Sequence, residues 1–186
     1  MKALVIDSTA DRLVIIGING EKEEIFVGES GARRHTGSIL VAIEKVLEKC
    51  HLQPMELNYI GVVVGPGSFT GIRIGVATAN AMAFASRAKV VQITSLEPVI
   101  FGKETGLALL DCKHNNFYAL ARQDGKDSYL SLSGTETDNY GIPKYIIDKP
   151  LPVLLISVFK DKVAKSDFVV TARPFYLKKS SAELLC

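Results

Sequence analysis

The segment of this sequence best suited to chemistry is glycine-rich, Gly65-Pro66-Gly67-Ser68-Phe69-Thr70-Gly71. It follows a β-branched run and precedes an alanine-rich stretch, which predicts a turn from a buried strand into a helix. Such turns commonly present backbone amides to an anion. A P-loop would need a Gly-Lys-Ser/Thr sequence here, but no lysine lies between Asn58 and Lys89. The dinucleotide-binding pattern needs glycine or alanine where Thr70 stands, so neither phosphate motif fits.

Hydrolytic chemistry is also disfavoured. A serine-hydrolase elbow around Ser68 would need glycine two places earlier, where the sequence has Pro66. The three histidines (His35, His51 and His114) flank no recognisable aspartate pattern. A lone histidine before a helix, as at His35, is more often a cap or a surface residue than a general base. We therefore assign no catalytic residue.

The candidate metal ligands in the sequence are two carboxylates and three thiols. Asp7 and Asp111 each end an apolar run and could face one cleft as a magnesium-holding pair, although an inactive remnant of such a site is the favoured interpretation. Cys50, Cys112 and Cys186 are widely separated, odd in number and without a C-x-x-C pair, which indicates reduced thiols. We expect no metal centre, and the sequence leaves any cofactor-binding residues unknown.

The first hundred residues predict one complete lobe. A meander of three strands should be followed by helix, strand, helix and strand, an order typical of the α/β actin-like, ribonuclease-H-like folds. The expected strands are 2–6, 12–18 and 23–27, then 59–64 and 90–93, and the expected helices are 39–50 and 70–87. Asn19-Gly20 supplies the turn of the second hairpin.

The remainder predicts a smaller second lobe. Short apolar runs at 107–110, 117–121, 129–132 and 153–156 are typical of strands, with Gly and Pro in the loops between them. We expect an N-terminal lobe over 1–104 and a shortened C-terminal lobe over 105–186.

Composition excludes several function classes. With 47% hydrophobic and 23% charged residues, the 186-residue chain should fold as an ordinary globular protein. Its net charge of +2 and its basic doublets, Arg33-Arg34 and Lys178-Lys179, do not predict strong RNA binding by this chain alone. No window reaches membrane-spanning length and no signal-peptide core is present, so we expect a cytoplasmic protein without membrane contact.

The helix predicted over 70–87 is unusually apolar. From residue 71 to 85 its only polar side chains are Arg73, Thr78 and Asn80, so it should be covered nearly all round. Gly71, Gly75, Ala79 and Ala83 form a ridge of small residues at a spacing of four, which favours close approach of another element. That element is either a helix of a partner or this chain's own first helix and sheet.

Residues 65–85, GPGSFTGIRIGVATANAMAFA, closely resemble the signature of the TsaB family, formerly called YeaZ. These are actin-like accessory proteins of bacterial tRNA threonylcarbamoyladenosine synthesis. Four further segments are similar to family motifs: 32–35, 93–97, 111–119 and 173–177. The chain departs from the family pattern at Asp7-Ser8-Thr9 and at His114-Asn115-Asn116.

The resemblance implies a partner. TsaB proteins pair with TsaD, a related catalytic subunit, through a bundle made by the first two helices of both, and TsaE and ATP join them. It therefore implies a partner interface on the two helices here, for which we expect Ile39, Leu40, Ile43, Val46, Leu47, Phe69, Gly71, Ile72, Gly75, Val76, Ala79, Met82 and Ala83. tRNA would be reached only indirectly, through the complex.

The resemblance also implies the absence of catalysis. The catalytic relative carries two metal-binding histidines where this chain has Ser95 and Val99, and neither can replace an imidazole. Residues 7–12 contain no glycine, and no Gly-Gly occurs in the chain, which disfavours tight ATP binding. ATP and metal would then belong to the partner subunits.

Three hypotheses remain open. The first is a non-catalytic scaffold that binds and activates TsaD in threonylcarbamoyl transfer to adenosine 37 of tRNA. The second is an independent enzyme, either an actin-like ATPase or kinase or a protease-like hydrolase. The third is a homodimer that uses the same helical surface on itself, because an exposed apolar patch favours burial.

Overall fold

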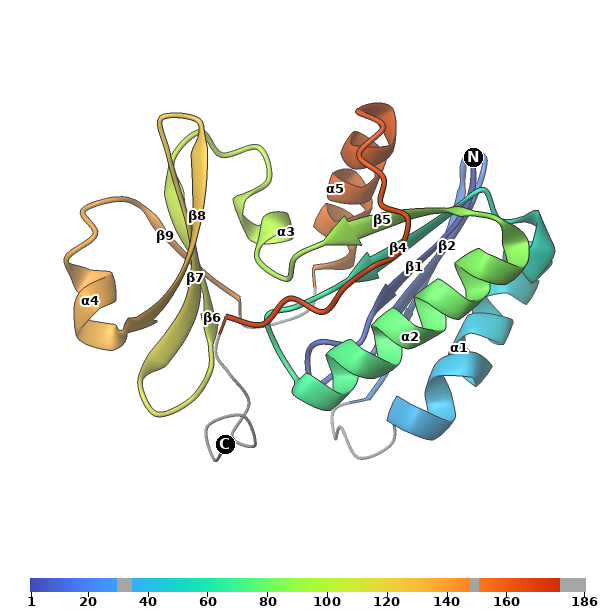
Figure 1. The fold of residues 1–186 in the computed structure, drawn as a ribbon, viewed down its shortest axis with the longest axis horizontal. Helices are drawn as coiled ribbons and strands as arrows, with labels where there is room; N and C mark the ends of the chain where they lie inside the picture. The colour runs from blue at the N-terminus through green and yellow to red at the C-terminus, as the bar shows by residue number, and fades with distance from the viewer. Residues whose placement is uncertain (30–34, 148–150, 178–186) are drawn as a thin grey trace.

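The computed structural model describes residues 1–29, 35–147 and 151–177, and these form two mixed β-sheets with helices packed against both (Figure 1). The first sheet has the order β3-β2-β1-β4-β5 and the second the order β8-β7-β6-β9. The strands are β1 (Lys2–Asp7), β2 (Val14–Asn19), β3 (Lys22–Val27), β4 (Tyr59–Val63), β5 (Lys89–Ile93), β6 (Gly106–Asp111), β7 (Asn116–Gln123), β8 (Lys126–Ser133) and β9 (Lys144–Ile147). The helices are α1 (His35–Lys49), the 3-10 turn η2 (Pro54–Glu56), α2 (Phe69–Ser86), α3 (Glu97–Ile100), α4 (Gly134–Asp138) and α5 (Pro152–Ala164).

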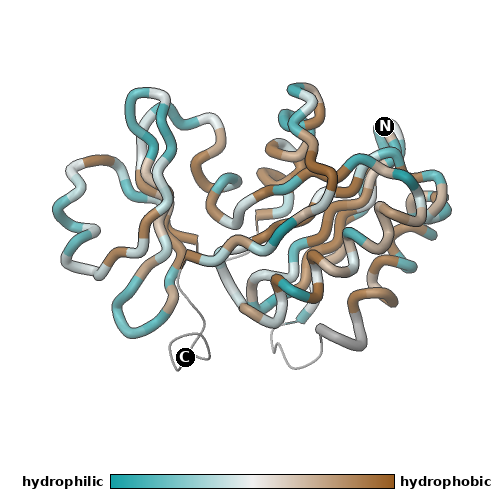
Figure 2. The backbone as a smooth tube through the Cα atoms, viewed as in Figure 1, coloured by the Kyte–Doolittle hydropathy of each residue, from teal (hydrophilic) through white to brown (hydrophobic). Residues whose placement is uncertain are grey.

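The first sheet is covered on both faces. β1 pairs antiparallel with β2 and parallel with β4, and its side chains alternate between two cores. Leu4 and Ile6 pack with residues of α1 and α2, while Ala3 and Val5 pack with residues of α5. α1 and α2 therefore share one face of the sheet and α5 lies on the other, as Figure 1 shows. Most residues of β1, β2 and β4 are buried, and hydrophobic colouring predominates along the middle of this sheet in Figure 2.

The second sheet repeats the topology of the first. β6 pairs antiparallel with β7 and parallel with β9, and β7 pairs antiparallel with β8, just as β1 pairs with β2 and β4, and β2 with β3. Within the described residues the second sheet has no counterpart of β5. The duplication is one of topology, since residue identities show no repeat.

The strand predicted over 153–156 is wrong, because these residues belong to α5. Leu155, Ile156, Val158 and Phe159 are buried at helical spacing, a pattern that a four-residue window cannot distinguish from a strand. Gly61 in β4 allows the close packing of α5, since a Cβ there would lie 2.8 Å from the Phe159 ring.

The predicted lobe boundary also needs correction. The strands of the second sheet lie within 106–147, whereas the helix that follows them packs against the first sheet. α5 packs in the core of the first sheet. Residues 168–177 then run along the first lobe, where Val169 pairs with Val90 of β5 and the Phe175 amide donates to the Val64 carbonyl at 2.8 Å. We refer to residues 168–177 as the C-terminal strap.

Candidate functional site

The small-residue ridge of α2 packs against the chain's own first strand. Ser68 caps the helix by accepting a hydrogen bond from the Gly71 amide at 3.2 Å. The buried Ser8 hydroxyl, just beyond β1, donates to the Gly71 carbonyl at 2.8 Å. A Cβ at Gly71 would overlap the Ser8 carbonyl, and one at Gly75 would overlap the Ser8 hydroxyl. The two glycines are therefore explained by packing within the chain.

Most of the residues expected to contact a partner are buried in the monomer, which corrects the interpretation of the ridge. Ten of the thirteen are buried within the isolated chain under α1 and α2: Ile39, Ile43, Val46, Leu47, Gly71, Ile72, Gly75, Val76, Ala79 and Ala83. Of the other three, Leu40 is 64% exposed, and Phe69 and Met82 are half-buried. Only these three remain available to a partner.

The opposite side of α2 is exposed and nearly as apolar. Arg73, Ala77, Ala81 and Ala85 are all exposed at a spacing of four, and Phe84 beside them is 90% exposed. α1 adds Leu40 and Val41, the latter 47% exposed. We call these seven residues the outer helical face. A nearly fully exposed phenylalanine in an alanine-rich stripe is typical of a surface that docks.

Sequence reasoning missed six of the seven residues of this face: Val41, Arg73, Ala77, Ala81, Phe84 and Ala85. The signal for four of them was present, because Arg73, Ala77, Ala81 and Ala85 form a second series at a spacing of four, offset by two residues from the glycine ridge. An offset of two residues on a helix is a rotation of about 200°, so the two series lie on opposite sides. Both series are present in the sequence, and the structure shows that the second series faces solvent.

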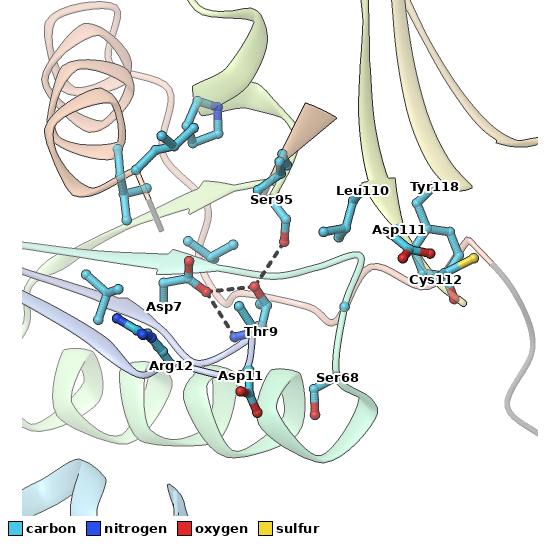
Figure 3. Close-up of a pocket in the computed structure, with 18 of the residues that line it drawn as sticks. Asp7, Thr9, Asp11, Arg12, Ser68, Ser95, Leu110, Asp111, Cys112 and Tyr118 are labelled. Atoms are coloured by element: carbon cyan, nitrogen blue, oxygen red, sulfur yellow. Dashed lines mark hydrogen bonds between the residues drawn. The ribbon is translucent and has the colours of Figure 1, made fainter. Parts of the chain in front are cut away.

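A second candidate site is a cleft of about 970 Å³ between the two sheets. It opens at the carboxyl ends of β1 and β4 in one sheet and of β6 and β9 in the other, the usual place for ligands in α/β proteins. Figure 3 shows Asp7, Thr9 and Ser95 on one wall and Asp111, Cys112 and Tyr118 on the other. The structure thus brings the predicted Asp7 and Asp111 carboxylates to one cleft.

The loop after β1 is closed on itself by hydrogen bonds. Asp7 Oδ1 accepts from the Thr9 amide at 2.9 Å and from Thr9 Oγ1 at 2.7 Å, and Thr9 Oγ1 lies 3.1 Å from Ser95 Oγ. Burial raises the pKa of the Asp7 carboxyl above its ordinary value, although these hydrogen bonds oppose the shift. The Thr9 amide is thereby satisfied within the loop and is not presented to a phosphate. On the facing wall, Asp111 Oδ1 accepts from the Lys113 amide at 2.7 Å.

In the part of the chain that the structure describes, Ser95 and Val99 do not gather with other potential metal ligands. Ser95 is engaged with Thr9, and Val99 packs in an apolar cluster of the second lobe. Among the described residues, no three His, Cys, Asp or Glu side chains gather as metal ligands. His51 follows α1 and His114 lies in the turn between β6 and β7, so the two are in different lobes. Within the described ranges, Cys50 and Cys112 form no disulfide.

Some sequence predictions fall on residues outside the described ranges. These are the Ala32-Arg33-Arg34 part of the motif before α1, Lys178-Lys179 and Cys186; the side chain of His35 is likewise not described. Across 1–29, 35–147 and 151–177, no helix combines the length and the apolar character needed to span a membrane.

Comparison with known proteins gives a consistent family. Residues 24–141 match the family model described as TsaD: tRNA N6-adenosine threonylcarbamoyltransferase. The TsaB protein of Haemophilus influenzae is 30% identical over 122 residues, covering 62% of this chain and 51% of that protein. The TsaB protein of Escherichia coli is 27% identical over 156 residues, covering 80% and 66%. The tRNA N6-adenosine threonylcarbamoyltransferase of Geobacter metallireducens is 28% identical over 123 residues, covering 62% and 35%.

The matches are partial in sequence but nearly complete in structure. The chain spans about half the length of the first curated relatives, 51% and 44%. YeaZ from Pseudomonas aeruginosa superposes with a TM-score of 0.75 at 18% identity, covering 95% of this chain and 99% of that one. A second Pseudomonas aeruginosa structure, of a protein with similarity to peptidase YEAZ, gives 0.77 at 19% identity with the same coverage. The predicted α/β actin-like fold is confirmed.

Proposed function

The chain belongs to the family of tRNA N6-adenosine threonylcarbamoyltransferases, on its TsaB (YeaZ) branch, and from this premise we propose that it is a non-catalytic scaffold subunit. In this proposal it binds and activates a TsaD-like catalytic subunit in threonylcarbamoyl transfer to adenosine 37 of tRNA. A TsaE-like ATPase joins the complex, and tRNA is reached through the complex.

The observation that carries the proposal is the outer helical face. Phe84 and Leu40 are 90% and 64% exposed, and the small side chains of Ala77 and Ala81 would let a partner helix approach the α2 backbone closely. Water-exposed apolar surface of this kind is stabilised by burial, which gives association its driving force. The Haemophilus influenzae and Escherichia coli relatives are named for threonylcarbamoyladenosine biosynthesis, and a catalytic member of the same family is the natural partner.

The cleft supports the non-catalytic part of the proposal. Ser95 and Val99 cannot form a metal centre, and the loop after β1 uses the Thr9 amide internally. The chain therefore contributes contacts, while ATP and metal belong to the partner subunits.

The test mixes the purified chain with the TsaD protein of the same organism and measures association by size-exclusion chromatography with light scattering, with and without ATP. Ala81→Arg places a charge on the outer helical face and should abolish the complex. Ala164→Arg, at an exposed position on the last turn of α5 on the other side of the sheet, is the matched control and should bind normally. Equal binding of both variants would refute the interface.

An independent actin-like ATPase or hydrolase is the alternative, favoured by one observation: Asp7 and Asp111 share a cleft of about 970 Å³. ATP turnover by the chain alone, without association with TsaD, would establish it. A concentration-dependent homodimer that Ala81→Arg dissociates, with no mixed complex, would indicate self-association through the same face.

A further inference from the structure

We propose that Arg73 is an anchor that receives a carboxylate side chain of the partner at one end of the outer helical face. The inference rests on the proposed docking function and names what the partner must present there. It is carried by the contacts of the Arg73 guanidinium, which hold it in place but leave most of its donors unused.

The guanidinium contacts two aromatic residues. Its Cζ atom is 3.8 Å from the centre of the Phe69 ring, and its Nε donates a hydrogen bond to the Tyr176 hydroxyl at 3.2 Å. The Tyr176 ring is in turn stacked on Phe69, with ring centres 5.0 Å apart. An exposed arginine normally samples many rotamers, and these two contacts favour one of them before any partner arrives.

The C-terminal strap holds Tyr176 in this position. Asn80 of α2 exchanges two hydrogen bonds with the Ala172 backbone, at 3.0 Å and 2.9 Å, and Ala172 is buried. Nearer Tyr176, the Phe175 amide donates to the Val64 carbonyl at 2.8 Å, and the Phe175 ring meets Tyr129 edge-on, with ring centres 5.0 Å apart. The aromatic partner of Arg73 thus comes from a segment more than a hundred residues away in sequence.

Nothing in the described residues uses the remaining donors. Within 1–29, 35–147 and 151–177, no acidic side chain pairs with Arg73, and the guanidinium makes no other hydrogen bond to these residues. The first turn of α2 also contains no acidic residue, so the helix itself supplies no carboxylate near the guanidinium. A planar fork with its two Nη groups available is complementary to a carboxylate, which it binds in bidentate geometry.

The position of Arg73 on the helix indicates which molecule supplies the carboxylate. Arg73 begins the exposed series that continues through Ala77 and Ala81, so a helix packed along that stripe ends or passes beside the guanidinium. We therefore assign the anion to the protein that covers the outer helical face, as a glutamate or aspartate of that partner.

The test measures the affinity of variants for the TsaD protein of the same organism by isothermal titration calorimetry. Arg73→Gln removes the charge and Arg73→Glu reverses it. If the partner presents a carboxylate, Arg73→Gln should weaken binding about tenfold or more, and Arg73→Glu should weaken it further by repulsion. Arg73→Lys keeps the charge without the fork and should fall between wild type and Arg73→Gln.

Two further variants separate positioning from folding. Tyr176→Phe keeps the stack on Phe69 and should retain most of the affinity, whereas Tyr176→Ala releases the guanidinium and should lose several-fold. Lys126→Gln, an equal charge change on the β7–β8 hairpin of the second lobe, is the control and should bind as wild type does. Thermal denaturation of each variant alone confirms that it is folded.

The outcomes distinguish this inference from the docking proposal. If wild type binds and Arg73→Glu binds as well as Arg73→Gln or better, the partner presents no carboxylate and the inference is wrong while docking stands. If Arg73→Gln matches Lys126→Gln, Arg73 is not an anchor. If wild type does not bind at all, both proposals fail.

Discussion

Phe84→Ala should weaken the complex with the TsaD-like subunit strongly while leaving the isolated chain as stable as before. Phe84 is 90% exposed, so in the monomer its ring contributes almost nothing to the core. Exposed substitutions of this kind change the free energy of unfolding by about 0.5 kcal/mol or less, and alanine is also the better helix former. Any large effect must therefore appear in binding.

The magnitude follows from the area available for burial. A phenylalanine side chain buries on the order of 150 Å² or more in an interface, and truncation to alanine removes roughly 120 Å² of it. At about 25 cal/mol per Å² this amounts to about 3 kcal/mol. The variant also avoids the entropy cost of ordering the phenylalanine side chain on binding, about 1 kcal/mol. The net loss of binding free energy is then about 2 kcal/mol, or roughly 30-fold in Kd.

Isothermal titration calorimetry measures the affinity, and circular dichroism melting checks the fold. The matched control is Val153→Ala on α5, an exposed apolar residue (68%) on the opposite side of the first sheet, which should change neither quantity. An affinity for Phe84→Ala within twofold of wild type would show that the ring is not buried in the complex, and the docking surface would have to lie elsewhere.

Two more predictions concern the monomer. Gly75→Ala should lower the melting temperature, because the new Cβ would overlap the Ser8 hydroxyl; we expect a loss of roughly 1–3 kcal/mol despite the better helix propensity of alanine, and a stabilised variant would contradict the close packing. Asp7→Asn should stabilise the chain at neutral pH. Because the folded-state pKa of Asp7 is raised, its stabilising contribution is full below the ordinary aspartate pKa of about 4 and is lost as the pH rises through the folded value. The stability difference between Asp7→Asn and wild type, measured by melting from pH 4 to 8, should therefore grow with pH; a constant difference would refute the shift.

The first lobe could be predicted from sequence because its signals are local and mutually consistent. The β-branched run at β4, the Asn19-Gly20 turn and the helical periodicity of α1 each indicate one element, and together they match one topology. The strand prediction for 153–156 was wrong because the local signal there is ambiguous. A four-residue apolar run is compatible with strand and helix, and only its packing across Gly61 of β4 decides between them.

The site was harder to predict than the fold. Hydrophobic periodicity shows which residues share one face of a helix, but not whether that face points to the core or to solvent. α2 is apolar all round, so its hydrophobic pattern has no clear polar side from which to orient it. Contacts between distant segments were also invisible. Tyr176 reaches Arg73, and Asn80 binds Ala172, only because the strap returns along the first lobe.

The two series of small residues on α2 have different structural roles. The effect of a substitution on docking can therefore be separated from its effect on the stability of the monomer. The inward series, at Gly71 and Gly75, is required by the backbone and side chain of Ser8 within the same chain. No described residue of the chain covers the outward series at Ala77 and Ala81, so the monomer has no packing reason to keep those side chains small. Larger residues at 77 and 81 should therefore be tolerated by the monomer and rejected only by the complex, whereas at 71 and 75 they should be rejected by both.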